Sequence, residues 1–256
     1  MKVAILAGGV GSRLAEETEI KPKPMVEIGG KPILWHIMMH YAHYGLKQFV
    51  IALGYKGDLI KRFMVDYCSL NGNLSVNFRD GTISTQADGR EDWTVELVDT
   101  GQATLTGGRI KRLAPYIGDE TFMLTWGDGV SDVNLHELLK FHRSHGRMVT
   151  ITAVRPPARF GRLDMLGDQV VRFSEKPQLS EGWINGAFFV LEPAVFDYIK
   201  GDDTQWESEP LERLAEDGEV MAYRHHSFWQ CMDTLRDKRL LERAWAEGPA
   251  PWKVWS

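Results

Sequence analysis

The chain has 256 residues, a formal net charge of −5 and ordinary shares of apolar and charged residues. This length suits one large α/β domain, or a domain with a small appendage, and the acidic balance lacks the basic footprint of a nucleic-acid-binding protein. No stretch approaches the roughly 18 apolar residues of a membrane span, and two cysteines, Cys68 and Cys231, form neither a disulfide framework nor a zinc motif. Because a strand pattern stands where a secretory leader would, we expect a cytoplasmic protein without membrane or nucleic-acid partners.

The N-terminal segment combines a buried strand with a glycine-rich loop. The apolar run 3–7 shows no polar alternation, which is typical of a strand covered on both faces of a parallel sheet. Glycines at positions 8, 9 and 11 let the chain turn sharply and bring N–H groups close to an anion. Arg13 adds a guanidinium suited to phosphate. In the following KPKP segment, the prolines present Lys23 on a stiff loop.

Two common glycine motifs are absent from this loop. Leu14 stands where the third glycine of a Rossmann fingerprint would be, and no Walker P-loop sequence occurs. The remaining interpretations are an anion-binding loop, or an ordinary strand-to-helix turn followed by surface lysines.

Strand and helix patterns then alternate. Helical spacing of apolar residues covers 34–41 and 59–67, and buried strands are expected at 49–53, 122–126 and 149–154. A strand at 93–98 leads into a second glycine- and threonine-rich loop, 99–109, and a short helix, 110–116. Residues 71–78 suggest a further strand, and the polar segment 79–92 suggests a long mobile loop. This alternation predicts an α/β fold with a doubly wound, mostly parallel sheet.

The pattern of expected secondary structure changes at Arg155. Shorter strands are expected at 161–165, 169–175 and 184–191, a small helix at 195–199, a helix starting at 209, a strand at 220–225 and a charged helix at 233–245. We predict a single domain over 1–256, with a soft division into a core of 1–155 and a small α+β elaboration of 156–256. The aromatic C-terminal segment, PWKVW, is expected to pack on its own domain or on a neighbouring subunit.

Two aspartates stand at boundaries between elements. Asp128 lies in a Gly-Asp-Gly sequence at the end of a buried strand, the edge of an open α/β sheet where ligands bind. A carboxylate there suits Mg²⁺, which takes one or two carboxylates together with phosphate oxygens. The alternative is a plain Asp-Gly turn. Asp233 precedes a predicted helix, where it can serve as an N-cap or as a second ligand.

Three further patterns remain open on the residues alone. Lys176, followed by proline, is either a ligand-binding lysine or a solvated turn residue. Asn185, in an apolar strand beside Gly186, can bond a sugar hydroxyl or neighbouring backbone. His36 and His40 have a spacing that can bind zinc, but the glutamate of that motif is missing.

Several of these segments together resemble a known family. LAGGVGSRL and KPKPM are similar to the N-terminal signature of the sugar-1-phosphate nucleotidyltransferases. GYKG, WGDGVSDV, FSEKP, INGAFFVLEP and MDTLRDK, in that order, resemble the branch that uses CTP and glucose 1-phosphate. The resemblance covers nearly the whole chain and is weakest over residues 71–92.

The resemblance implies a nucleotidyltransferase (EC class 2.7.7) with a nucleotide-binding core and a sugar-binding C-terminal part. It would transfer CMP from CTP to α-D-glucose 1-phosphate, giving CDP-glucose and pyrophosphate, with Mg²⁺ as cofactor. The family also implies a homo-oligomer and a place in sugar synthesis for surface polysaccharide. Such a reaction requires positioning and charge neutralisation more than a covalent nucleophile.

The resemblance also assigns residue roles. Arg13 and Lys23 would be catalytic, with Lys23 neutralising the α-phosphate under attack. The nucleotide would be bound by Leu6, Ala7, Gly8, Gly9, Val10, Gly11, Ser12 and Arg13, and by a loop carrying Thr104, Thr106 and Arg109. Asp128 would contact substrate and hold Mg²⁺ together with Asp233. Lys176 would bind the sugar phosphate, and Glu175 and Asn185 the sugar. Trp126, Ala187 and Cys231 depart from the tyrosine, glycine and proline common at their positions.

Two alternatives stay open on the sequence. The same fold can use UTP or dTTP, because pyrimidine choice depends on hydrogen bonding at the 4-position of the base. The second alternative is a non-catalytic sensor or scaffold that binds sugar nucleotides. The presence together of Arg13, Lys23, Asp128 and Asp233 argues against the sensor.

Overall fold

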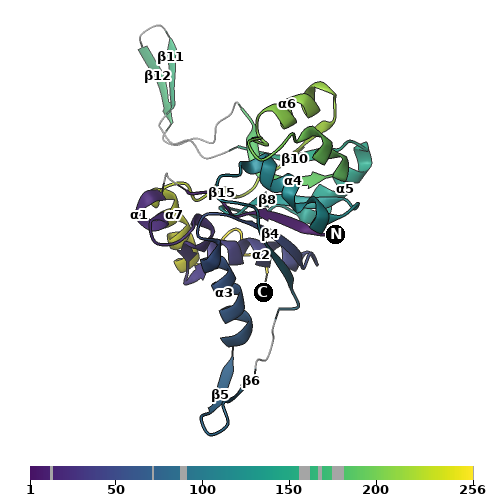
Figure 1. The fold of residues 1–256 in the computed structure, drawn as a ribbon. Coiled ribbons are helices and arrows are strands. Elements are labelled where there is room, and N and C mark those ends of the chain that lie inside the picture. Colours follow the sequence, from purple (N-terminus) through teal and green to yellow (C-terminus); the bar gives the residue numbers. More distant parts are fainter. Residues whose placement is uncertain are drawn as a thin grey trace.

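A seven-stranded sheet forms the centre of the protein in the computed structural model, which describes residues 1–11, 14–70, 72–86, 91–155, 162–166, 169–174 and 182–255 (Figure 1). In spatial order its strands are β14 (Val220–Arg224), β10 (Val149–Val154), β13 (Ile184–Leu191), β8 (Phe122–Trp126), β1 (Val3–Leu6), β4 (Gln48–Leu53) and β7 (Thr94–Asp99). β13 is antiparallel to β8 and β10, and the other neighbouring pairs are parallel. The predicted mostly parallel sheet is confirmed.

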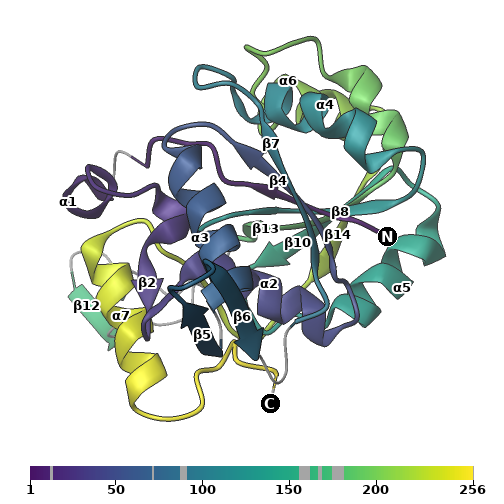
Figure 2. The same ribbon diagram turned by 60° about the horizontal axis from the view of Figure 1, so that its bottom comes forward.

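Helices cover both faces of the sheet, which explains why its strands are apolar without alternation. Within β1, Val3 and Ile5 belong to one hydrophobic core, and Ala4 and Leu6 to another. Residues of α2 (Ile33–His43), α3 (Gly57–Leu70), α5 (Leu135–His145) and α7 (Leu235–Ala246) contribute to the first core. The second is covered by α4 (Thr106–Ile117), α6 (Glu209–Glu216) and the 3₁₀ helix η3 (Pro193–Tyr198). Figure 2 shows α4 and α6 on one side of the sheet, with α2 and α3 on the other.

Several small elements lie outside the central sheet. They are α1 (Ala15–Thr18), the 3₁₀ helix η2 (Lys23–Met25), and the antiparallel pairs β2 (Glu27–Ile28) with β3 (Lys31–Pro32), β9 (Gly129–Ser131) with β15 (Trp229–Cys231), and β11 (Arg162–Leu166) with β12 (Gln169–Ser174). Although β13 and β14 follow Arg155 in sequence, both are strands of the central sheet. In the described part of the chain, no helix has the length and apolar character needed to span a membrane.

The segment after α3 differs from expectation. The strand expected at 71–78 is present as β5 (Asn73–Asn77), but residues 82–86 of the expected loop form β6 (Thr82–Gln86), which pairs antiparallel with β5. Polar residues favour a loop when read alone, whereas the main-chain pairing of a hairpin accepts them. Figure 1 shows this hairpin projecting from the body, at the end away from the β11–β12 ribbon.

The C-terminal segment packs on its own domain through an aromatic cluster at α2. Trp252 is fully buried, and its indole N–H donates to Nδ1 of His36 (3.4 Å). The other ring nitrogen of His36, Nε2, lies 2.9 Å from the carbonyl oxygen of Ile28. His36 therefore carries its proton on Nε2 and is neutral. Burial lowers the pKa of His36 to about 4, from an ordinary value of 6.5.

This buried histidine makes stability depend on pH. Because the unfolded chain binds the proton more tightly than the folded protein, stability is lost as the pH falls from about 6.5 towards 4. The free energy of unfolding should fall by about 2 kcal/mol between pH 7 and pH 5 through His36 alone. Urea denaturation of the wild type and of His36→Asn at both pH values checks this. The variant should be less stable at pH 7 but lose less stability on acidification, and an equal loss in both proteins would contradict the assignment.

Candidate active site

The loops after β1 and β8 meet at the carboxyl edge of the sheet. The two strands are parallel neighbours, with Leu6 opposite Trp126, and the N–H of Gly127 donates to the carbonyl of Leu6 (2.9 Å). The glycine-rich loop and the Gly127–Asp128 turn therefore lie side by side. Between them and the start of α4 lies a cavity of about 330 Å³, within the usual range of small-molecule sites.

Most of the predicted site residues converge on this cavity. It is lined by Leu6, Ala7, Gly8, Gly9, Gly11, Lys23, Thr104, Thr106, Arg109, Asp128 and Asp233, together with Pro24, Leu105, Trp126 and Gly127. Val10 is exposed and does not line it. Asn185 lies on β13, outside the cavity lining, and its side-chain oxygen accepts from the N–H of Ala187 (2.7 Å). Ser12, Arg13, Glu175 and Lys176 lie outside the described residues.

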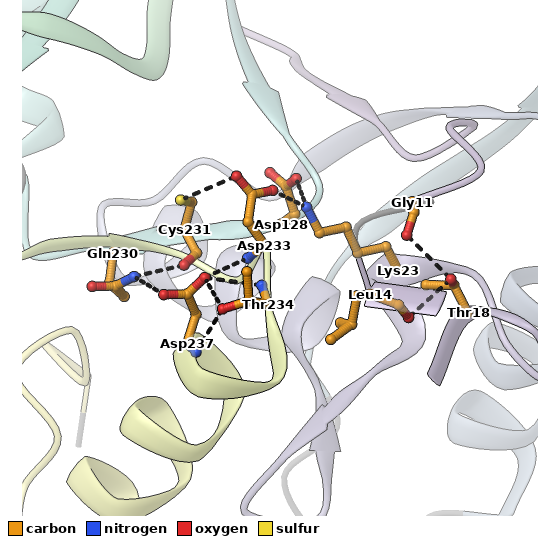
Figure 3. Close-up of polar contacts among 10 residues, drawn as sticks. All are labelled: Gly11, Leu14, Thr18, Lys23, Asp128, Gln230, Cys231, Asp233, Thr234 and Asp237. Atoms are coloured by element: carbon orange, nitrogen blue, oxygen red, sulfur yellow. Dashed lines mark hydrogen bonds and ion pairs between the residues drawn. The ribbon is translucent and has the colours of Figure 1, made fainter. Parts of the chain in front are cut away.

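A lysine joins the two aspartates at the floor of the cavity. The Nζ atom of Lys23 lies 2.7 Å from Oδ2 of Asp128 and 2.5 Å from Oδ1 of Asp233 (Figure 3). Burial by itself would lower the pKa of Lys23. The charges and hydrogen bonds of Asp128 and Asp233 outweigh burial, so the pKa of Lys23 is raised and the ammonium stays charged.

The short β9–β15 ribbon fixes the spacing of the two aspartates. Cys231 is opposite Gly129, and beyond this pair the N–H of Met232 donates to the carbonyl of Asp128 (2.8 Å). The ribbon thus carries Asp128 just before the start of β9 and Asp233 just after the end of β15. Since main-chain hydrogen bonds hold both strands, the carboxylates are placed before any ligand binds.

Asp237 anchors the second aspartate and was not predicted. Its Oδ2 accepts from the backbone N–H of Asp233 (3.1 Å) and of Thr234 (2.9 Å), and from the hydroxyl of Thr234 (2.8 Å) (Figure 3). Thr234 and Asp237 form a capping box at the start of α7. The Thr-x-x-Asp spacing was a readable signal for this arrangement, but it identifies only a helix start and does not reveal that the cap holds Asp233.

Arg109 ties three loops together from beneath the cavity. Its guanidinium donates to the carbonyls of Leu53 (3.0 Å), Gly101 (2.8 Å) and Gly8 (3.1 Å), and to the hydroxyl of Thr100 (2.7 Å). The side chain is buried, with only 4% of its surface exposed. A Cβ on Gly8 would lie 2.2 Å from Nη1 of Arg109, so any other residue there would displace the guanidinium from these hydrogen bonds. These contacts hold the loop that follows β1 in place.

The three departures from the family pattern each have a structural setting. The indole N–H of Trp126 donates to Oε1 of Glu207 (3.1 Å), whose Oε2 accepts from Thr106 (2.6 Å), a contact that tyrosine could not make in the same way. Ala187 has a φ of 59°, a conformation in which glycine is less strained. The thiol of Cys231 lies 3.8 Å from Asp233; burial and the neighbouring carboxylates raise its pKa to about 12, so it remains protonated.

The family is established by comparison with known proteins. The model of the nucleotidyl transferase family matches residues 2–234, and the chain belongs to this family. The fold agrees with that of HddC from Yersinia pseudotuberculosis, with a TM-score of 0.70 at 24% identity, covering 95% of this chain and 99% of the other.

Within the family, the resemblance to the CTP-using branch is confirmed. The chain is 52% identical over its full length to the glucose-1-phosphate cytidylyltransferase of Salmonella typhimurium strain LT2, covering all of both chains. It is 44% identical, again over all of both chains, to a probable glucose-1-phosphate cytidylyltransferase of Bacillus subtilis strain 168.

Arg109 can be tested against an exposed arginine of the same helix. Arg109→Lys should lower the free energy of unfolding by about 2–4 kcal/mol, because one ammonium cannot reach all the oxygens that the guanidinium bonds, and several charge-assisted hydrogen bonds between the loops are lost. Arg112→Lys should cost less than about 1 kcal/mol, since its ion pair with Asp202 is exposed. Urea denaturation measures both, and equal losses would show that the Arg109 network contributes no special stability.

Proposed function

We propose that the protein transfers CMP from CTP to α-D-glucose 1-phosphate, forming CDP-glucose and pyrophosphate with Mg²⁺ as cofactor. The observation that carries the proposal is the convergence of Lys23, Asp128 and Asp233 beside the glycine-rich loop, in a chain of this family. The choice of CTP and glucose 1-phosphate follows the names of the relatives. CDP-glucose would then serve the synthesis of surface polysaccharide, as the family analogy suggests.

The residues present fit a metal ion that arrives with its substrate. Among the described residues, no group of three or more His, Cys, Asp and Glu side chains could hold an ion by itself. Asp128 and Asp233 supply two carboxylates at one position, which matches the habit of Mg²⁺ of completing its coordination with phosphate oxygens and water. When bound, the ion would neutralise negative charge on the phosphates of CTP.

Residues of the chain itself would bind the nucleotide and stabilise the charge that develops during the reaction. The backbone N–H groups of Gly8, Gly9 and Gly11 would receive the nucleotide, in a loop held by Arg109. Lys23 would stabilise the charge that develops as a phosphate oxygen of glucose 1-phosphate attacks the α-phosphorus and pyrophosphate leaves. No general base is needed, because the attacking phosphate is already an anion. Arg13, Lys176, Glu175 and Asn185 complete the proposal as contacts to phosphate and sugar.

Donor preference is tested by pyrophosphate release. Purified protein with glucose 1-phosphate and Mg²⁺ should release pyrophosphate fastest with CTP, compared with UTP and dTTP at equal concentration. A clear preference for UTP or dTTP would overturn the choice of donor but not the reaction. Binding of CTP without pyrophosphate release from any sugar phosphate would instead favour a sensor.

Lys23→Ala tests the proposed transition-state role. The variant should lower kcat by a factor of about 10² or more, since a charge aimed at the reacting phosphate is lost. Lys21→Ala is the matched control. Lys21 lies in the same segment, but its Nζ atom pairs with Oε1 of Glu27 (3.0 Å) and it does not line the cavity, so the kcat of this variant should be unchanged. Circular dichroism and thermal unfolding confirm that both variants fold. Near-normal turnover by a folded Lys23→Ala protein would refute the role.

Asp128→Asn tests the proposed metal ligand. A neutral amide binds Mg²⁺ more weakly than a carboxylate, so the Mg²⁺ concentration for half-maximal rate should rise about tenfold or more. An Mg²⁺ titration of the rate that is unchanged from wild type would contradict the assignment.

The β5–β6 hairpin supports the proposal of a homo-oligomer. Register places Leu74, Val76 and Ile83 on one face, with Ser75 and Ser84 on the other, yet Ile83 remains 66% exposed and Phe78, beyond the end of β5, 94% exposed. An isolated two-stranded hairpin is marginally stable in water, so a second copy of the chain would supply the missing cover.

Light scattering tests this assembly. Wild-type protein should have the mass of a multimer, and Ile83→Lys should shift it towards the monomer. Ser84→Lys, on the polar face, should leave the mass unchanged. A monomeric wild type would refute the proposal.

We also infer a single nucleotidyltransferase domain and a cytoplasmic location. The first is supported by β13 and β14, which join the sheet built from the first 155 residues. The second is consistent with Cys68 and Cys231 being unpaired.

A further inference from the structure

Lys23 contacts the same carboxylate oxygens that a divalent ion would need. Its Nζ atom lies 2.7 Å from Oδ2 of Asp128 and 2.5 Å from Oδ1 of Asp233, and only 11% of the side chain is exposed. Figure 3 shows the ammonium pointing between the two carboxylates. The lysine therefore already balances part of their negative charge. Two neighbouring, half-buried carboxylates require such a positive charge beside them, because they repel each other and are partly removed from water.

An ion and this ammonium compete for one position. Mg²⁺ lies about 2.0–2.1 Å from its oxygen ligands, so an ion bound to both of these oxygens would have to occupy the space that Nζ holds. The repulsion between a divalent ion and an adjacent ammonium, at low local dielectric, adds to this conflict. An ion without nucleotide can therefore bind the two carboxylates only by displacing the ammonium of Lys23, which then loses both of its anionic partners.

A triphosphate changes that balance. The four-carbon stem of lysine is flexible, and the cavity beside it is lined by the glycine-rich loop proposed to receive the phosphates. Arg109 is the other described cation at the cavity, but backbone carbonyls already hold its guanidinium. Lys23 is therefore the described cation that can turn from the aspartates to a phosphate without leaving the cavity.

We propose that Lys23 determines the form in which the metal is accepted: it keeps free divalent ions out of the Asp128–Asp233 site until a triphosphate offers its ammonium another anionic partner. This inference rests on the proposed function. It makes Lys23 a specificity-determining residue for the metal–nucleotide complex, in addition to its proposed role towards the α-phosphate. The metal and the triphosphate consequently bind together.

Binding of Mn²⁺ in the absence of nucleotide tests the proposal. Electron paramagnetic resonance measures free Mn²⁺ in titrations of the full-length wild type, Lys23→Met, Lys21→Met and the double variant Lys23→Met/Asp128→Asn. Lys23→Met should bind Mn²⁺ at least about tenfold more tightly than wild type, because a competing cation is removed while both carboxylates remain. Lys21→Met should match the wild type, and the double variant should lose the gain.

A second variant covers a failure of Lys23→Met to fold. Lys23→Gln keeps N–H donors for the aspartates but removes the charge, so it should also bind Mn²⁺ more tightly than wild type. Equal Mn²⁺ affinity in the wild type and in a folded uncharged variant would overturn the inference. The outcome is separate from the proposed function: a wild type that releases pyrophosphate normally yet binds Mn²⁺ tightly without nucleotide refutes this inference alone.

Discussion

The ammonium of Lys23 between two carboxylates is the interaction on which the site depends. It joins three segments distant in sequence: the first residue of η2, the turn after β8 and the residue just before the cap of α7. Charges that are largely removed from water are costly unless they are paired, so each of the three groups requires the other two. The same pairing underlies the metal binding that we propose. Two aspartates balanced by one lysine can exchange that lysine for a metal ion when the phosphates of the nucleotide offer the lysine another anionic partner.

The groups that hold this site are distinct from those that would do chemistry in it. Arg109 bonds carbonyls at the end of β4 and in the loops after β1 and β7, and Asp237 bonds the N–H groups at the start of α7. Both act on the backbone of the surrounding segments and so fix where those segments lie. The sequence predicts that Arg109 contacts the nucleotide. Arg109 does line the cavity, but its guanidinium donates its hydrogen bonds to oxygen atoms of the protein itself. Glu207 plays a similar part for Trp126 and Thr106.

Sequence patterns succeeded where one local rule was decisive and failed where pairing decided the structure. The apolar runs of β1, β4 and β8 need burial on both faces, and only a helix-covered parallel sheet provides it, so the fold class was predictable. β6 was missed because its polar residues have no burial signal, and only main-chain pairing with β5 makes them a strand. The hydrogen-bond partners of Thr106 and Arg109 were equally invisible, because they come from segments up to about a hundred residues away.

By itself the sequence determined the fold class, the family and the residue types at the sheet edge. Glycines after a buried strand, a lysine between prolines and two aspartates at element boundaries are local features that stand in the chain whatever surrounds them. Only the tertiary structure decided that Lys23 contacts both aspartates at once, and that Asp237 orients one of them. The reason is that distances of a few ångströms between side chains depend on strand order and register, to which many distant contacts contribute together.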